Sequence, residues 1–191
     1  MVTAPYQLQP RTHFVEADTP HHKPVLLQHV LDSFDIPSPK LIVDGTIGAG
    51  GHSCALLEKF SSLKLIGIDR DPEALEIASK RLAPYSDRTI LACERFSNFA
   101  QVMENNSEAQ ADLLLFDIGV SSMQIDNTER GFSFRFDAPL DMRMGNDSET
   151  ALDLMHRLDE EELANVIYQY GEERLSRRIA KQIKLALEED R

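Results

Sequence analysis

The stretch from Val43 to His52 constrains the fold more than any other part of the chain. It follows the short apolar run Leu41–Val43, contains one acid and four glycines, and leads into a segment with helical spacing. Glycines let a backbone approach a ligand closely, and the first N–H groups of a helix point toward the same place. A strand, a glycine-rich turn and a helix in this order predict the ligand-binding corner of a doubly wound α/β sheet.

Apolar runs typical of strands alternate with segments of helical spacing through the first two thirds of the chain. We expect strands at 41–43, 64–69, 89–93 and 111–116, and helices at 51–60, from Pro72 onward and around 99–103. This alternation predicts a parallel sheet with right-handed crossovers. The acids that close three of the strands, Asp44, Asp69 and Asp117, would then meet at the ligand-binding edge.

Several helix boundaries can be predicted from single residues. Pro24 suits the first turn of a helix, and Asp71, Ser97 and Asp159 suit helix N-caps. Gly171 is expected to end the helix that Asp159 begins.

Composition restricts the class of protein and its partners. The 191 residues are 42% hydrophobic and 27% charged, which is ordinary for a globular protein, and the net charge of −12 argues against wholesale electrostatic binding to nucleic acid. Cys54 and Cys93 lack metal-ligand spacing and are expected to be buried and reduced, and no metal site is predicted.

No apolar run approaches the ~20 residues that span a bilayer, and the N-terminus lacks a signal peptide. We therefore expect a cytoplasmic protein with no membrane contact.

The spacing of the glycines favours one nucleotide-like cofactor over another. A dinucleotide fingerprint has the form G-x-G-x-x-G. Here Gly48 and Gly50 follow Asp44 by four and six residues, and Thr46 stands where a first glycine would be. This resembles the acid-x-G-x-G-x-G turn of S-adenosylmethionine enzymes. A nicotinamide-dependent oxidoreductase is the alternative, because an acid such as Asp69 binds a ribose in either class.

Two further residues are candidates for the site. Phe96, predicted to follow the third strand, could stack on adenine or could be an ordinary core residue. Asp117 begins a turn at the place where amino-methylating enzymes carry an Asp/Asn-Pro-Pro-aromatic turn. An exocyclic base amine is a poor nucleophile, so an acceptor for its N–H and a fixed geometry both help. A carboxylate near the sulfonium would instead stabilise the ground state, so Asp117 fits an amine acceptor or orienter better than an electrostatic catalyst.

Longer motifs show a resemblance to a known family. They are His22-x-Pro-Val-Leu-Leu, Asp44-Gly-Thr-Ile-Gly-Ala-Gly-Gly-His, Gly67-Ile-Asp-Arg-Asp-Pro, Asp117-Ile-Gly-Val-Ser-Ser-Met-Gln, Glu129-Arg-Gly-Phe-Ser-Phe, Pro139-Leu-Asp-Met-Arg-Met and Tyr170-Gly-Glu-Glu-Arg. From about residue 21 to its end, the chain closely resembles the bacterial ribosomal RNA small-subunit methyltransferase H (MraW-type) family. Members of that family methylate N4 of one cytidine in 16S ribosomal RNA with S-adenosylmethionine.

The resemblance implies a fold, a site and partners. The fold is a Rossmann-like class I S-adenosylmethionine methyltransferase sheet with a helical inserted domain, here partly present. The cofactor contacts are Gly50, Gly51, His52, Asp69, Phe96, Asp117 and Gln124, with Asp117 also catalytic. Met123 stands where the family usually has proline, which predicts a less rigidly held Gln124. The partner would be small-subunit ribosomal RNA or the assembled small subunit, and the resemblance leaves the oligomeric state open.

The expected organisation has three parts: a flexible arm at 1–20, a cofactor-binding domain at 21–135 with an incomplete sheet, and the start of a helical substrate-recognition domain at 136–191. Family members are about half as long again, so we expect a C-terminally truncated chain whose fourth strand leaves an apolar edge exposed. A truncated module that holds cofactor or RNA without turnover is therefore a second hypothesis.

Two basic segments could contact RNA. Arg130, Arg135 and Arg143 alternate with phenylalanines, Phe132, Phe134 and Phe136, and could hold phosphates and stack a flipped base, or could pair with Asp126, Asp137 and Asp141. The last predicted helix, 172–189, has an apolar face and a basic face that is either solvated or in contact with phosphates. The apolar face comprises Leu175, Ile179, Ile183 and Leu187, and the basic face Arg174, Arg177, Arg178, Lys181 and Lys184.

Overall fold

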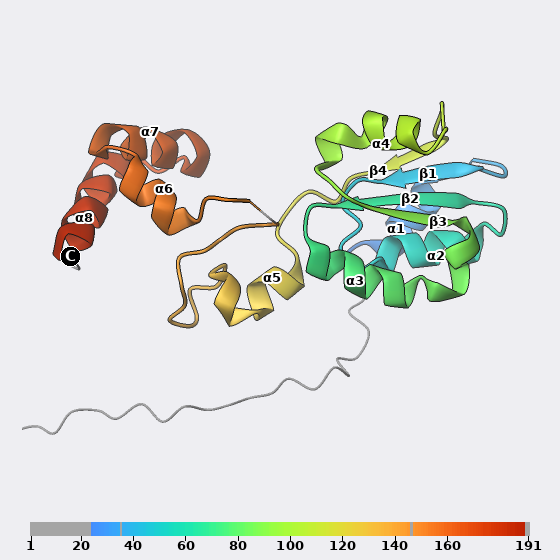
Figure 1. Cartoon of the computed structure of the whole chain (residues 1–191), viewed down its shortest axis with the longest axis horizontal. Coiled ribbons are helices and arrows are strands. Elements are labelled where there is room, and N and C mark those ends of the chain that lie inside the picture. The colour runs from blue at the N-terminus through green and yellow to red at the C-terminus, as the bar shows by residue number, and fades with distance from the viewer. Residues whose placement is uncertain (1–23, 35, 146, 190–191) are drawn as a thin grey trace, which may run out of the picture.

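A four-stranded parallel sheet is the centre of the fold in the computed structural model, which describes residues 24–34, 36–145 and 147–189 (Figure 1). The strands are β1 (Leu41–Asp44), β2 (Lys64–Asp69), β3 (Thr89–Cys93) and β4 (Leu113–Leu115). They lie in the order β3-β2-β1-β4, and every pairing is parallel. The order reverses between β1 and β4, as in doubly wound sheets, which confirms the predicted Rossmann-like α/β fold. The predicted arm at 1–20 and His22 lie outside the described residues.

Helices connect the strands and continue beyond them. They are α1 (Leu27–Ser33), α2 (Gly51–Lys59), α3 (Pro72–Arg81), α4 (Phe99–Asn105), α5 (Ser122–Asp126), α6 (Ala151–Arg157), α7 (Glu160–Gly171) and α8 (Ser176–Glu189). Short 3-10 turns occupy Ala83–Arg88, Phe96–Asn98 and Thr128–Arg130. None of the helices in the described ranges combines the length and the apolar composition that a membrane crossing requires.

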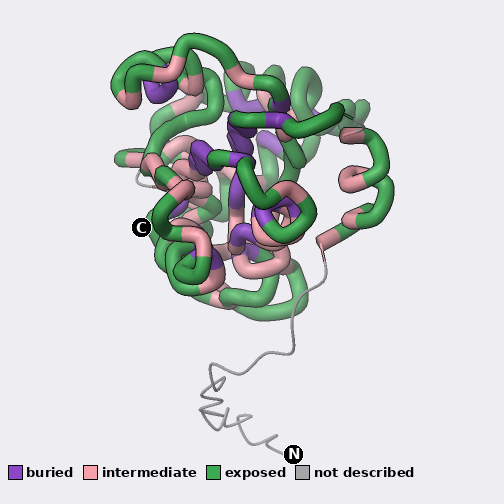
Figure 2. Tube along the Cα trace, turned by 90° about the vertical axis from the view of Figure 1, so that its right-hand side faces the viewer, coloured by how far each residue is buried: buried purple, intermediate pink, exposed green. Residues whose placement is uncertain are grey.

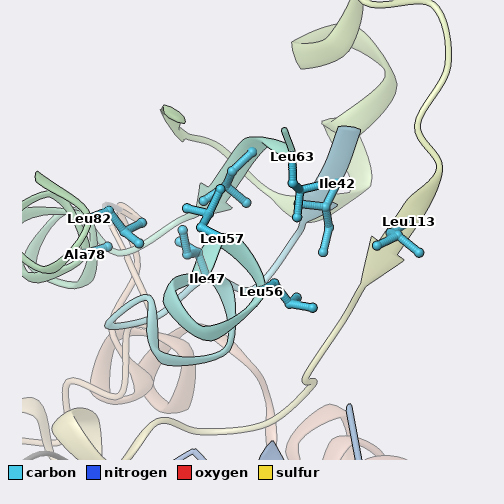
Figure 3. Close-up of a cluster of buried hydrophobic side chains, with 9 residues drawn as sticks. Ile42, Ile47, Leu56, Leu57, Leu63, Ala78, Leu82 and Leu113 are labelled. Carbon is cyan, nitrogen blue, oxygen red and sulfur yellow. The ribbon is translucent and has the colours of Figure 1, made fainter. Parts of the chain in front are cut away.

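The side chains of the strands alternate between two apolar layers. On one face, Ile42, Leu65 and Leu113 pack with residues of α2 and α3, as Figure 3 shows for most of this cluster. On the other face, Val43 and Ile66 pack against α4. Both central strands are therefore covered on both sides, and burial in Figure 2 is concentrated inside the layers. This packing fixes the carboxyl ends of β1 and β2, where the site is expected.

The β4 side of the sheet is open within the described residues. β4 pairs with β1, and Leu114 and Phe116 are 46% and 36% exposed, respectively. A hollow of about 520 Å³ lies beside α4 and is bordered by Leu114. The expected apolar edge at the fourth strand is thus present.

A small helical cluster follows the sheet and lies apart from it in Figure 1. α6, α7 and α8 pack around Leu163, Ala164 and Ala180. Asp159 caps α7 in a capping box with Glu162, as predicted. Where the helical domain starts, near residue 136, stays a prediction.

Several predicted boundaries are wrong. The first helix begins at Leu27 rather than in the turn at Pro24, and β4 is shorter than 111–116. Asp112 lies just before β4, and its carboxylate accepts from the backbone N–H groups of Lys40 and Leu41. Ser97 is not an N-cap, because it lies inside the 3-10 turn that precedes α4. The end of α7 is as predicted, because Gly171 is its last residue, and Glu172 after it adopts the left-handed conformation at φ 52°.

The apolar face predicted for the last helix is also wrong in part. Leu175 lies before α8 and is 59% exposed, and Ile179 is 37% exposed. The small residues Ser176 and Ala180 are buried instead, because they let α8 lie close to α7.

Candidate functional site

The candidate site lies at the carboxyl ends of β1, β2 and β4, around the point where the strand order reverses. Asp44 and Asp69 are the last residues of β1 and β2, and Asp117 follows β4 by two residues. The predicted convergence of the three acids at one sheet edge is therefore present. Their environments differ greatly, and so do the roles that they can have.

Asp44 is a buried structural acid. It is 2% exposed; Ser53 Oγ donates to its Oδ2 at 2.6 Å and the Thr46 N–H to its Oδ1 at 3.2 Å. Burial raises the pKa of Asp44 to about 6, against the lowering effect of these two hydrogen bonds. Asp44 therefore ties the end of β1 to the first turn of α2 and is closed to a ligand.

The glycines of the turn have distinct positions. Gly48 has φ +51°, and a side chain there would project into open space. Gly50 has φ +75° and lies against Ala78 of α3, and a Cβ at Gly51 would clash with the ring of Pro24. Protein thus covers one side of Gly50 and Gly51, and the open approach to the backbone is at Gly48. α2 begins without a side-chain cap, so its first N–H groups also border this turn.

Asp69 is oriented by the backbone on both sides. Its Oδ2 accepts from Gly48 N at 2.9 Å and its Oδ1 from Asp71 N at 3.0 Å. Each carboxylate oxygen has a second lone pair. Asp69 can therefore still accept hydrogen bonds from a diol next to the open face of Gly48.

Asp117 is held by the turn after β1 and faces His52. Its N–H donates to Thr46 Oγ1 at 2.7 Å, although the two residues are 71 positions apart. Its carboxylate is 63% exposed and lies 4.0 Å from His52 Nδ1, while His52 Nε2 is 3.0 Å from the carbonyl of Val25. The backbone of Asp117 is fixed, and its side chain is open to a substrate.

A change at Thr46 tests this link directly. Thr46→Val removes the acceptor, so we expect hydrogen exchange of the Asp117 amide to become about fivefold faster, because a hydrogen bond contributes about 1 kcal/mol. Thr46→Ser keeps the hydroxyl and is expected to exchange at the wild-type rate. The measurement is amide exchange followed by NMR, and equal rates in wild type and Thr46→Val would contradict the link.

Phe96 belongs to an aromatic cluster beside the site. Its ring meets that of Phe116 edge to face at 5.7 Å, and a side chain at Gly45 would clash with Phe116. Phe96 is 43% exposed, so it is neither a plain core residue nor fully free. One part of its ring surface remains open for stacking.

Gln124 has a local structural role. It is 8% exposed and forms a capping box with Ser121 at the start of α5, where its Oε1 accepts from Ser121 N at 3.0 Å. Its Nε2 lies 3.5 Å from the carbonyl of Met144. Gln124 is thus in place and hydrogen-bonded, and whether Met123 makes it less rigid than proline would stays a prediction. Whether Gln124 also contacts a cofactor stays a prediction.

The arginines of the loop after Gly119 divide between the two predicted roles. Arg143 pairs with Asp141 at 2.6 Å, as the structural alternative expects, and holds the pKa of Asp141 down at about 2. Arg130 also pairs with acids, but with Asp71 and Glu73 rather than with those predicted. Arg135 is exposed and has no ion pair among the described residues. It lies between Phe134, which is fully exposed, and Phe136, which is 57% exposed.

Sequence reasoning missed three contributors: Thr46, Ser53 and Phe116. Thr46 stands out as the departure from the glycine pattern, which was a usable signal. Ser53 and Phe116 act through contacts that no spacing in the sequence reveals. No group of three or more His, Cys, Asp or Glu side chains within the described ranges is arranged to hold a metal ion.

Comparison with known proteins gives consistent matches. The profile of the MraW methylase family matches residues 19–190. A ribosomal RNA small subunit methyltransferase H from Synechococcus sp. (strain CC9605) is 49% identical over 172 residues, covering 88% of this chain and 56% of that protein. The protein of the same name from Methylorubrum extorquens (strain AM1) is 44% identical over 173 residues, covering 91% of this chain and 49% of that protein.

The chain thus spans about half the length of the curated relatives that it matches. Among solved structures, an rRNA methylase from Streptococcus thermophilus overlaps 40% of this chain and 43% of that chain, at 23% identity and a TM-score of 0.32.

Proposed function

Because the chain belongs to the MraW methylase family, we propose that it binds S-adenosylmethionine between the ends of β1, β2 and β4 and methylates N4 of a cytidine in small-subunit ribosomal RNA. One observation carries the proposal. The exposed carboxylate of Asp117 is anchored through its own backbone to Thr46, at the same sheet edge as the oriented Asp69. Such a ribosomal substrate would place the protein in the cytoplasm.

The residues at this edge fit the cofactor. The backbone of Gly48 is accessible to a ligand next to Asp69. The carboxylate of Asp69 has lone pairs left that can accept hydrogen bonds from the two ribose hydroxyls. The half-exposed Phe96 could stack on adenine, and the first N–H groups of α2 could meet the carboxylate of the methionine part. When bound, the cofactor supplies an electrophilic methyl group. Gly50, Gly51 and His52 would shape this pocket more than line it, because protein packs against each of them.

The chain's own contribution to the reaction is to position the amine. Asp117 would accept an N–H of the cytidine amine, which keeps the nitrogen lone pair directed at the methyl donor. His52 Nδ1 lies 4.0 Å from the carboxylate and its Nε2 lies 3.0 Å from the carbonyl of Val25, so His52 can help to orient Asp117. The step then needs neither a covalent nucleophile nor a metal ligand from the chain.

Two exposed basic surfaces are candidates for the RNA. In the loop, Arg135 lies between two exposed phenylalanines, the combination that binds a phosphate and stacks a base. In the helical cluster, Arg177, Arg178 and Lys181 are exposed on α8. Lys184 is different, because its ammonium group donates to the carbonyl of Met155 and is used within the protein.

Substitutions in the loop test the RNA contact. Phe134→Ala is expected to weaken binding of a cytidine-containing single-stranded RNA by about 1–3 kcal/mol through lost stacking. Arg135→Gln is expected to weaken binding and to reduce the salt dependence by about one phosphate contact. Arg157→Gln is the matched control, because Arg157 pairs with Glu149 on the surface of α6. Titrations by fluorescence anisotropy at several salt concentrations measure all three, and an unchanged affinity in both loop variants would contradict the assignment.

A specific observation favours a second candidate function. In the described residues, β4 pairs with β1 and has no partner on its other side, and its apolar Leu114 and Phe116 are 46% and 36% exposed. A module that binds cofactor or RNA without turnover would have these properties. A nicotinamide-dependent oxidoreductase has no comparable support.

Methyl transfer separates these candidates. The purified chain is incubated with labelled S-adenosylmethionine and small ribosomal subunits from a strain that lacks the modification. Label at N4 of one cytidine supports the methyltransferase. Cofactor binding without transfer supports the module, and binding of NADH without S-adenosylmethionine would contradict both.

A further inference from the structure

We propose that Arg130 is a positioning residue that couples the long loop after β4 to the turn carrying Asp69, so that cofactor binding and the order of the loop depend on each other. This inference rests on the proposed cofactor site. It assigns a role to an arginine that the reaction itself does not use.

Arg130 makes an unusually complete set of contacts for a loop arginine. Its Nη2 donates to Asp71 Oδ2 at 2.8 Å and to the carbonyl of Arg143 at 3.0 Å, and its Nη1 donates to Glu73 Oε2 at 3.1 Å. The side chain is only 16% exposed, and that of Asp71 only 6%. A charge pair with this little exposure is weakly screened, and loss of one partner leaves the other charge buried and unpaired.

The contact with Asp71 leads directly to the cofactor side of the turn. Asp71 caps α3 by accepting from Glu73 N, and its own N–H donates to Asp69 Oδ1. The other oxygen of Asp69 accepts from Gly48 N. The guanidinium, the turn and the glycine backbone thus form one continuous chain of hydrogen bonds. A shift at Arg130 would move the carboxylate proposed to hold the ribose.

The same arginine also joins the first part of the loop, at Arg130 itself, to its later part, at Met142 and Arg143. Its carbonyl accepts from Met142 N at 3.0 Å, while its side chain binds the carbonyl of Arg143. Gly131 follows at φ +70°, where a side chain would clash with the carbonyl of Pro139. The loop is therefore folded back on itself at Arg130.

A second anchor holds the far end of the loop to the same part of the sheet. Asp147 pairs with Arg70, in the turn after β2, and with Arg95 at 3.0 Å. Asp71, Glu73, Arg130, Asp141, Arg143 and Asp147 together border a hollow of about 370 Å³. Among the described ion pairs, the one that joins the loop to Asp71 is made by Arg130, and the N–H of Asp71 in turn donates to Asp69.

Two readouts test the coupling. S-adenosylhomocysteine affinity is measured by calorimetry, and hydrogen exchange of residues 131–145 is measured with and without this ligand. In the wild type, the ligand is expected to slow exchange in the loop. Arg130→Gln is expected to raise the Kd about tenfold or more and to abolish this protection. Arg130→Lys is expected to be intermediate, because lysine keeps the charge but lacks the planar fork of donors that reaches Asp71 and Glu73 together.

The controls separate the possible failures. Arg157→Gln removes a surface arginine–glutamate pair and is expected to change neither readout. Exchange in the buried strands β1 and β2 reports whether a variant still folds. If Arg130→Gln does not fold, Arg130→Lys provides the test.

The outcomes distinguish the two proposals. Wild-type affinity and wild-type protection of the loop in a folded Arg130 variant would overturn the coupling alone. A wild type that binds no S-adenosylhomocysteine would overturn the proposed function. In that case the link between Arg130 and the turn can still be tested without ligand. It requires that the amides of Gly48 and Asp71 exchange faster in Arg130→Gln than in the wild type.

Discussion

Alanine at position 117 is expected to slow methyl transfer at least about 100-fold while leaving S-adenosylhomocysteine affinity within about threefold of wild type. The exposed carboxylate is the proposed acceptor for the cytidine amine, and a misplaced reactant can cost about this factor. The backbone of Asp117, which Thr46 holds, is unaffected by the change, so the pocket should persist. Single-turnover transfer to small ribosomal subunits and calorimetry measure the two quantities.

Asparagine at the same position distinguishes an acceptor from a general base. The amide oxygen of Asp117→Asn can accept the same N–H, so we expect transfer within about tenfold of wild type. A general base would lose as much activity with asparagine as with alanine. Equal, severe losses in both variants would therefore contradict the assigned role.

Asparagine in place of Asp44 is expected to stabilise the fold at pH 7. Burial raises the pKa of Asp44 to about 6 from an ordinary value of 3.8. Between these values the folded state binds more protons than the unfolded state, so the contribution of Asp44 to stability falls as pH rises from about 4 to 6. At about 1.4 kcal/mol per pKa unit, the loss at pH 7 is up to about 3 kcal/mol. Asp44→Asn is nearly isosteric and removes this loss.

The measurement is urea unfolding from pH 4 to pH 8, followed by circular dichroism. Asp44→Asn is expected to remove the decline between pH 4 and 6. Asp112→Asn is a control of opposite sign, because the N–H groups of Lys40 and Leu41 lower the pKa of Asp112. The contribution of Asp112 is present at neutral pH and lost as pH falls below the ordinary value, so Asp112→Asn should be less stable at pH 7. A destabilised Asp44→Asn at pH 7 would show that charged Asp44 contributes favourably to folding.

Local patterns predicted the sheet well, because its determinants are local. Apolar runs placed β1, β2 and β3 closely, and the capping residues Asp71 and Asp159 lie where their side chains bond to the next turn. The convergence of Asp44, Asp69 and Asp117 followed from the geometry of parallel strands. The boundary at Ser97 failed, because this residue lies inside the 3-10 turn that precedes α4.

The details of the site depend on contacts between distant residues, and no pattern encodes them. Thr46 and Asp117 are 71 residues apart, and Arg130 lies 59 residues from Asp71. Sequence spacing could identify Arg130 as basic but could not say which acid it meets. It also could not show that Asp44 is closed off while Asp117 is open, because exposure depends on the packing of α2 and the loops.

Calorimetric titration of the purified chain with S-adenosylhomocysteine, and separately with NADH, tests the central claim most directly. We predict saturable one-to-one binding of S-adenosylhomocysteine and no binding of NADH, because the glycine turn offers Gly48 and Asp69 to a ribose but lacks the dinucleotide spacing. Binding of NADH, or no binding of S-adenosylhomocysteine by the folded chain, would contradict the account.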